Sequence, residues 1–200
     1  DYVVKLQSGN KQVLKLWSKF IAISLLHSDD IYKRLNVSLK REDLRGESAY
    51  NEDLPVLVQS LIDKGIAVKD QEAIVVFLEE FADKNGKPSV VLIQKRGGGY
   101  LYATTDLAAI YYRSTKLKAD RVLYFIDARQ GLHMKQIFCI AHKAGFLGNN
   151  MKLEHCAFGM MKGDDGQPFK TRSGGVIKLS DLLDEAILRA DKLLIKKESE

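Results

Sequence analysis

Tyr102, Asp106, Gln130 and His133 have the residue types and the spacing of a site for a cationic ligand. Tyr102 and Asp106 are four residues apart, so they share one face if a helix begins here. An ionised carboxylate there would suit a guanidinium, which is planar, permanently charged and rich in forked N–H donors. Gln130 and His133 begin the helix that follows the predicted strand 121–126, where polar side chains would face a ligand.

A purely structural explanation of the same segments is also open. Thr104 or Thr105 can cap the helix, and Asp106 can complement the helix dipole in its first turn. Asp127 can likewise be a helix cap, which would leave His133 as an ordinary surface residue.

Two later segments have features that suit a nucleotide. The predicted strand 154–158 ends at Phe158 and is followed by Gly159 and Met160, and the glycine lets a ligand ring approach the backbone closely. A glycine-framed loop then supplies donors for phosphate oxygens: Lys170, Thr171, Arg172 and Ser173. The loop lacks Walker A spacing, and a solvated basic loop is the alternative.

Composition limits the class of protein. No apolar run approaches the ~20 residues that span a bilayer, and the first residues lack the pattern of a signal peptide, so we expect a cytoplasmic protein without a membrane segment. Cys139, Cys156 and the four histidines form no metal-binding pattern, and no protein metal site is expected. The net charge of +5 is compatible with a polyanionic partner, and a solvated surface of mixed charge gives the same sum.

The first part of the chain is predicted to be helical and then β-rich. Apolar residues at helical spacing predict a helix over 12–27 with a well-buried face, and a second helix over 52–64 closes at Gly65. Alternation predicts a strand over 35–39. Three short β-prone runs at hairpin spacing predict a small antiparallel sheet: 66–69, 73–78 and 89–94.

From Tyr100 onward helices and strands alternate, which is the pattern of a parallel sheet with crossover helices. The predicted elements are helix 105–115, strand 121–126, helix 130–144, strand 154–158 and helix 179–196 with Ser180 as candidate cap. The fold class is therefore α/β, a nucleotide-binding fold that carries residues 66–98 as an antiparallel insertion.

These motifs together resemble the bacterial-type arginyl-tRNA synthetases, a family of class I aminoacyl-tRNA synthetases. The similarity runs along essentially the whole chain and is densest from residue 99 to 186. The segments that carry it include Gly46-Glu-Ser48, Gly99-Tyr-Leu-Tyr-Ala-Thr-Thr-Asp106, Asp127-Ala-Arg-Gln130, Phe158-Gly-Met-Met161, Phe169-Lys-Thr-Arg172 and Leu179-Ser-Asp-Leu-Leu-Asp-Glu-Ala186.

The resemblance implies a role for each candidate residue. Tyr102, Asp106 and Gln130 would recognise arginine. His133 would lie near the ATP side, where Phe158, Gly159 and Met160 would hold adenine. The residues Lys170, Thr171, Arg172 and Ser173 would form the family's version of the Lys-Met-Ser-Lys-Ser loop. The implied ligands are L-arginine, ATP with Mg²⁺, and tRNA(Arg), and a monomer is expected.

The resemblance also implies a domain layout within the class I Rossmann-like catalytic domain. Residues 1–65 would be its middle part, 66–98 the β insertion, 99–178 the second half of the core with the phosphate loop, and 179–200 a helix leading to the anticodon-binding domain.

Two departures from the class pattern qualify this interpretation. Thr171 stands where the class usually has its second lysine, so the residue that supplies that charge stays open. The His-x-Gly-His element of the class occurs nowhere in the 200 residues, and the chain does not begin with Met. We therefore expect an internal fragment that is inactive by itself. Another α/β nucleotidyl-transferring enzyme and a non-catalytic basic RNA-binding module are the alternatives.

Overall fold

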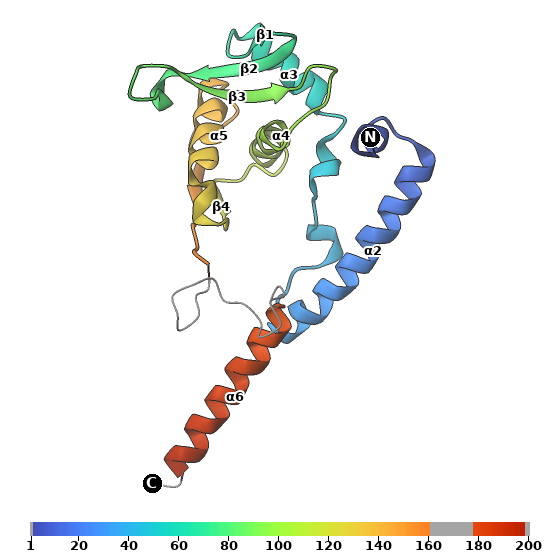
Figure 1. The fold of residues 1–200 in the computed structure, drawn as a ribbon, viewed down its shortest axis with the longest axis vertical. Helices are drawn as coiled ribbons and strands as arrows, with labels where there is room; N and C mark the ends of the chain where they lie inside the picture. The colour runs from blue at the N-terminus through green and yellow to red at the C-terminus, as the bar shows by residue number, and fades with distance from the viewer. Residues whose placement is uncertain (1, 161–177, 199–200) are drawn as a thin grey trace. The chain divides into compact units, whose positions relative to one another are not determined.

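In the computed structural model, residues 2–160 and 178–198 are described, and they fall into two compact units. Unit 1 comprises residues 1–10 and 44–159, and unit 2 comprises residues 11–43 and 160–200. The domain boundaries expected at residues 65, 98 and 178 remain a prediction. Each unit is considered by itself (Figure 1).

Unit 1 contains the antiparallel sheet predicted from the sequence. Strands β1 (Val68–Asp70), β2 (Ala73–Leu78) and β3 (Ser89–Gln94) pair in the order β1-β2-β3. Gln71 and Glu72 between β1 and β2 both have positive φ, 43° and 66°, which is the geometry of a tight two-residue hairpin turn. The prediction of three hairpin-linked strands is therefore confirmed.

A bulge in β3 is the point at which a hydrogen bond joins this sheet to the helix that follows it. Val75 pairs with Leu92 and Ile74 pairs with Gln94, so the register skips the fully buried Ile93. The hydroxyl of Thr104, also fully buried, donates a hydrogen bond to the Ile93 carbonyl. Thr104 therefore joins the helix to the sheet and does not cap the helix.

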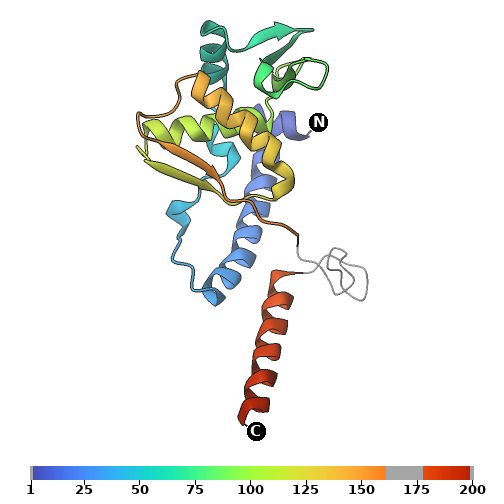
Figure 2. The ribbon, with the colours of Figure 1, turned by 90° about the vertical axis from the view of Figure 1, so that its left-hand side faces the viewer.

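The second part of unit 1 alternates helices and strands, as predicted. Helix α4 (Tyr102–Thr115) leads to β4 (Arg121–Tyr124), and α5 (Gly131–Lys143) leads to β5 (Lys152–His155). β4 and β5 pair in parallel with Arg121 opposite Lys152, and Figure 2 shows the pair beside α4 and α5. The unit is thus a mixed α/β structure with a three-stranded antiparallel sheet and a two-stranded parallel sheet.

One hydrophobic core holds unit 1 together. Helix α3 (Leu54–Asp63) ends two residues before Gly65, whose φ of 68° and N–H bond to the Ile62 carbonyl confirm the predicted helix stop. The fully buried side chains of the core come from α3, the antiparallel sheet, α4 and α5: Leu54, Leu61, Val76, Leu78, Ile93, Leu107, Ile110, Met134, Ile137 and Ile140. The same core thus supports both sheets together with α3, α4 and α5. The shorter elements of the unit are α1 (Tyr2–Gln7), η2 (Glu47–Tyr50), η3 (Glu79–Phe81) and η4 (Ala128–Gln130).

Unit 2 departs from the sequence predictions. Helix α2 (Lys11–Arg34) is longer than predicted and has no buried residue in the described structure, so the expected well-buried face is wrong. Phe20 and Leu26 are 65% and 60% exposed. The strand predicted over 35–39 is also wrong: no strand lies there, because Asn36 adopts φ 53° and closes α2.

The remaining elements of unit 2 are η1 (Arg41–Asp43) and α6 (Leu179–Glu198). Arg34 and Asp184 form an ion pair at 2.6 Å between α2 and α6. Ser180 lies inside α6 and does not precede it, so it is not the predicted cap. None of the described helices combines the length and apolar character needed to cross a membrane.

We expect Thr104→Val to destabilise the protein by about 1–3 kcal/mol, because the buried Ile93 carbonyl would lose its donor while the side-chain volume is kept. Thr105→Val is the matched control, since the Thr105 hydroxyl bonds locally to the Tyr102 carbonyl at 2.9 Å, and its effect should stay within about 0.5 kcal/mol. Chemical denaturation measures the free energy of unfolding of both variants. Equal free energies of unfolding for the two variants would contradict this role of Thr104.

Candidate active site

The first turn of α5 meets α4 at a cluster formed by Tyr102, Asp106 and His133. The imidazole Nε2 of His133 lies 2.7 Å from Asp106 Oδ2. The rings of Tyr102 and His133 are 4.8 Å apart at an interplanar angle of 66°, an edge-to-face contact. Tyr102 and Asp106 therefore share one face of a helix, as predicted, and His133 contacts both.

The position of Asp106 in α4 argues against the purely structural explanation. The helix begins at Tyr102, three residues before the predicted start, and its first turn has no acidic residue. Asp106 thus lies beyond the turn where an anion best complements the helix dipole. Its side chain is 33% exposed and that of His133 is 17% exposed. A carboxylate with one occupied oxygen and access to solvent is able to accept hydrogen bonds from a cation.

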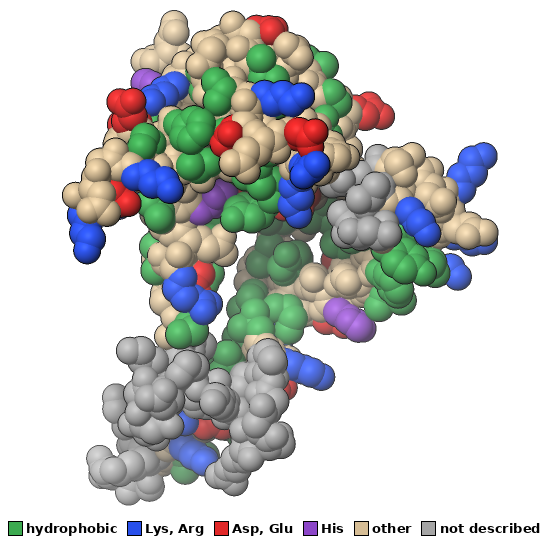
Figure 3. Space-filling view, turned by 45° about the horizontal axis from the view of Figure 1, so that its top comes forward, with side chains coloured by type: hydrophobic (Ala, Val, Ile, Leu, Met, Phe, Trp, Pro, Cys, Tyr) green, Lys and Arg blue, Asp and Glu red, His purple; other side chains and the backbone are tan. Residues whose placement is uncertain are grey.

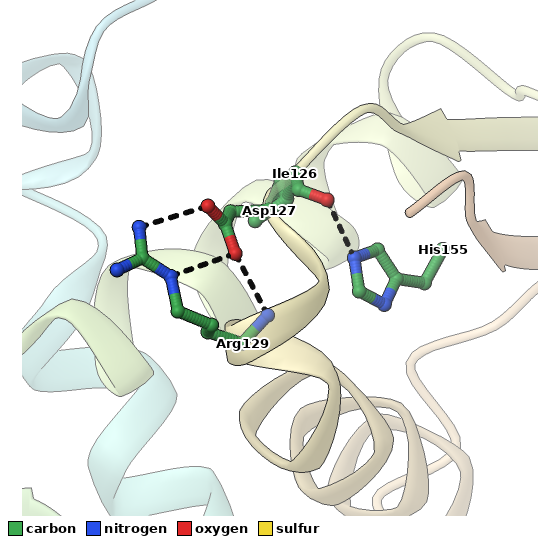
Figure 4. A network of polar contacts seen from close by, with 4 residues as sticks. All are labelled: Ile126, Asp127, Arg129 and His155. Carbon is green, nitrogen blue, oxygen red and sulfur yellow. Dashed lines mark hydrogen bonds and ion pairs between the residues drawn. The ribbon is translucent and has the colours of Figure 1, made fainter. Parts of the chain in front are cut away.

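The segment that leads from β4 into α5 is held by Asp127 (Figure 4). Its carboxylate accepts the Arg129 backbone N–H at 2.8 Å and pairs with the guanidinium of Arg129 through Nε at 3.0 Å and Nη2 at 2.9 Å. The side-chain hydrogen bond from Arg129 holds the pKa of Asp127 below its ordinary value. Asp127 is therefore a cap, and Gln130 is the last residue of η4 (Ala128–Gln130), directly before α5, with an exposed side chain.

The end of β5 is attached to this segment by hydrogen bonds beyond the regular strands. The Phe158 carbonyl accepts the Ala128 N–H at 2.8 Å, and the Phe158 N–H donates to the Ile126 carbonyl at 3.4 Å. A carbon added at Gly159 would meet no described atom within 4 Å, so no described residue fills the space beside it. Phe158 and Gly159 therefore lie at the same sheet edge as residues 127–130, as the sequence predicts for a ligand site.

His155 is a residue of this edge that the sequence analysis missed. Its Nε2 donates to the Ile126 carbonyl at 2.9 Å, the bond on the right of Figure 4. Because a carbonyl only accepts, Nε2 carries the proton. A histidine inside the predicted strand 154–158, three residues before Phe158, was the available signal.

Not all predicted site residues fall in this cluster. Met160 belongs to unit 2 and is 47% exposed. The loop residues Lys170, Thr171, Arg172 and Ser173 lie outside the described residues. Within residues 2–160 and 178–198, no group of His, Cys, Asp and Glu side chains is arranged to hold a metal ion.

Unit 1 also has a cavity of about 390 Å³ between α3, α4 and the end of α5, and Tyr102, Asp106 and His133 are not among the residues that line it. Lys64 lines it, but the Lys64 ammonium is already bonded to the Ala144 carbonyl and lies 5.3 Å from the centre of the Phe146 ring. That lysine closes the C-terminal end of α5, which is a structural role.

Known proteins resemble this chain along its whole length. All of residues 1–200 match the family of class I tRNA synthetases (R), catalytic domain. The arginine–tRNA ligase of Saccharophagus degradans is 62% identical over 192 residues, covering 96% of this chain and 33% of that protein. The arginine–tRNA ligase of Alteromonas mediterranea is 58% identical over 200 residues, covering 100% of this chain and 35% of that protein.

Solved structures agree with the sequence relatives. The arginyl-tRNA synthetase of Plasmodium falciparum superposes with a TM-score of 0.77 at 28% identity, covering 100% of this chain and 32% of that one. The chain thus spans about a third of the length of the relatives it matches. It belongs to the class I arginyl-tRNA synthetases and is part of their catalytic domain.

Proposed function

We propose that this chain is the later part of the catalytic domain of an arginine–tRNA ligase. The parent enzyme would activate L-arginine with ATP to arginyl-adenylate and transfer the arginyl group to tRNA(Arg). The observation that carries the proposal is the cluster of Tyr102, Asp106 and His133 at the junction of α4 and α5. Because the chain belongs to the arginyl-tRNA synthetase family, the cation that this cluster would bind is the guanidinium of arginine.

Asp106 would pair with the guanidinium of arginine, with Tyr102 and Gln130 beside it. Asp106 keeps a partly exposed carboxylate, Tyr102 is 61% exposed, and Gln130 directly precedes α5, three residues before His133. A forked guanidinium can satisfy a carboxylate and further acceptors at once, whereas the ammonium of lysine is a single point of charge. The pocket would therefore select arginine on geometry as well as on charge.

ATP would bind at the adjoining sheet edge. Phe158 and Gly159 follow β5, no described atom lies within 4 Å of a carbon added at Gly159, and hydrogen bonds fix the Phe158 backbone to Ile126 and Ala128. Met160 and the loop Lys170, Thr171, Arg172 and Ser173 would also contact ATP, with Mg²⁺ entering as the ion of bound ATP. The arginine carboxylate would attack the α-phosphorus and pyrophosphate would leave, while the loop's donors stabilise the developing charge.

The wider organisation is part of the same proposal. The antiparallel sheet would be an insertion in a Rossmann-like domain, and α6 would lead toward an anticodon-binding domain. The parent enzyme would act as a cytoplasmic monomer. The alternative of a basic RNA-binding module gains no support from the face of unit 1 in Figure 3, where acidic and basic side chains are interspersed and form no single basic patch.

In the parent enzyme, Asp106→Asn should raise the KM for arginine about 10- to 100-fold, because it removes a charge-assisted hydrogen bond worth about 1.5–3 kcal/mol. The KM for ATP should change little. Asp70→Asn, at an exposed residue of β1, is the control and should leave both values unchanged. Arginine-dependent ATP–pyrophosphate exchange gives both KM values for the wild-type enzyme and for the two variants. An unchanged arginine KM in Asp106→Asn would rule out the proposed pocket.

The chain by itself should show no arginine-dependent ATP–pyrophosphate exchange above background. The reason is that its 200 residues lack the His-x-Gly-His element that the class uses for ATP. The parent enzyme assayed at the same concentration is the positive control. Exchange by the 200-residue chain alone would show that its own residues suffice for activation.

A further inference from the structure

His133 is the most enclosed member of the α4–α5 cluster. Its side chain is 17% exposed, against 33% for Asp106, and the Tyr102 ring packs against its edge. The resemblance to the synthetases placed this histidine on the ATP side. Its described contacts are instead with the two α4 residues proposed to bind arginine.

The direction of the hydrogen bond follows from the chemistry of the groups. An ionised carboxylate only accepts, so His133 Nε2 carries the proton that is shared with Asp106 Oδ2 over 2.7 Å. That bond fixes the plane of the carboxylate and occupies one side of Oδ2. Oδ1 then remains to accept from an incoming cation, and the carboxylate does not need to reorganise when the cation arrives.

We infer that His133 is a positioning residue of the arginine pocket, which holds the Asp106 carboxylate in the orientation that a guanidinium requires. This inference rests on the proposed function. It deepens that proposal, because it assigns the pocket a member that contacts arginine only through Asp106. The planar guanidinium fork depends on the orientation of its carboxylate partner, so loss of the positioning bond should weaken arginine binding while leaving the charge of Asp106 in place.

Two substitutions in the parent enzyme separate the hydrogen bond from the ring. His133→Phe keeps an aromatic ring for the contact with Tyr102 but cannot donate to Asp106. His133→Gln loses the ring but carries an amide N–H that can donate over a similar reach. ATP–pyrophosphate exchange gives kcat and KM for each variant, and an ATP KM near the wild-type value shows that the variant is folded.

We expect His133→Phe to raise the arginine KM about tenfold with the ATP KM unchanged, and His133→Gln to recover most of that loss. In the Asp106→Asn background, His133→Phe should add little further, because the carboxylate that it positions is gone. A raised ATP KM with an unchanged arginine KM would overturn the inference and favour the ATP side. So would equal losses in the Phe and Gln variants, or full additivity with Asp106→Asn.

The outcome also separates this inference from the proposed function. If Asp106→Asn raises the arginine KM and His133→Phe does not, the positioning role fails and the pocket stands. If Asp106→Asn itself leaves the arginine KM unchanged, the proposed function of the pocket fails, whatever His133 does.

Discussion

The hydrogen bond from Thr104 to the Ile93 carbonyl is the contact on which the candidate site depends. The bulge in β3 leaves Ile93 outside the strand register, and a buried carbonyl without a donor would be costly. Thr104 supplies that donor from the first turn of α4. Tyr102 and Asp106 each lie two residues from Thr104, so the bond that completes the sheet also fixes the direction of the two side chains.

The other half of the cluster is fixed from the parallel sheet. The Ile126 carbonyl accepts from both His155 and Phe158, and Asp127 then caps the turn with Arg129 as its partner. These contacts lie immediately before α5, whose buried Met134 and Ile137 pack in the core shared with α4. The contact between His133 and Asp106 is thus determined by two independent anchors, one on each sheet. Two anchors of this kind would keep the Asp106 carboxylate in the orientation that a guanidinium requires.

The sequence predicted most of unit 1 because its signals are local. Short β-prone runs located β2 and β3, turn residues located the hairpins, and Gly65 located the end of α3. The shared face of Tyr102 and Asp106 follows from helical geometry alone. The contact of His133 with Asp106 joins residues 27 apart, and the bond from His155 to Ile126 joins residues 29 apart. No local pattern encodes either contact, since both depend on how α5 is seated against α4 and between β4 and β5.

The failed strand prediction over 35–39 has a physical reason that lies in one residue. The sequence Leu-Asn-Val-Ser-Leu alternates as a strand does, but Asn36 takes a left-handed conformation with φ 53°. Its N–H bonds to the Lys33 carbonyl and that of Val37 bonds to the Tyr32 carbonyl, the paired bonds of a Schellman helix stop. Asparagine is the residue after glycine best suited to that position, so a capping test would have outweighed the alternation. The apolar stripe of α2 was identified correctly, but periodicity shows only that a face is suited to burial, and the described residues leave that face exposed.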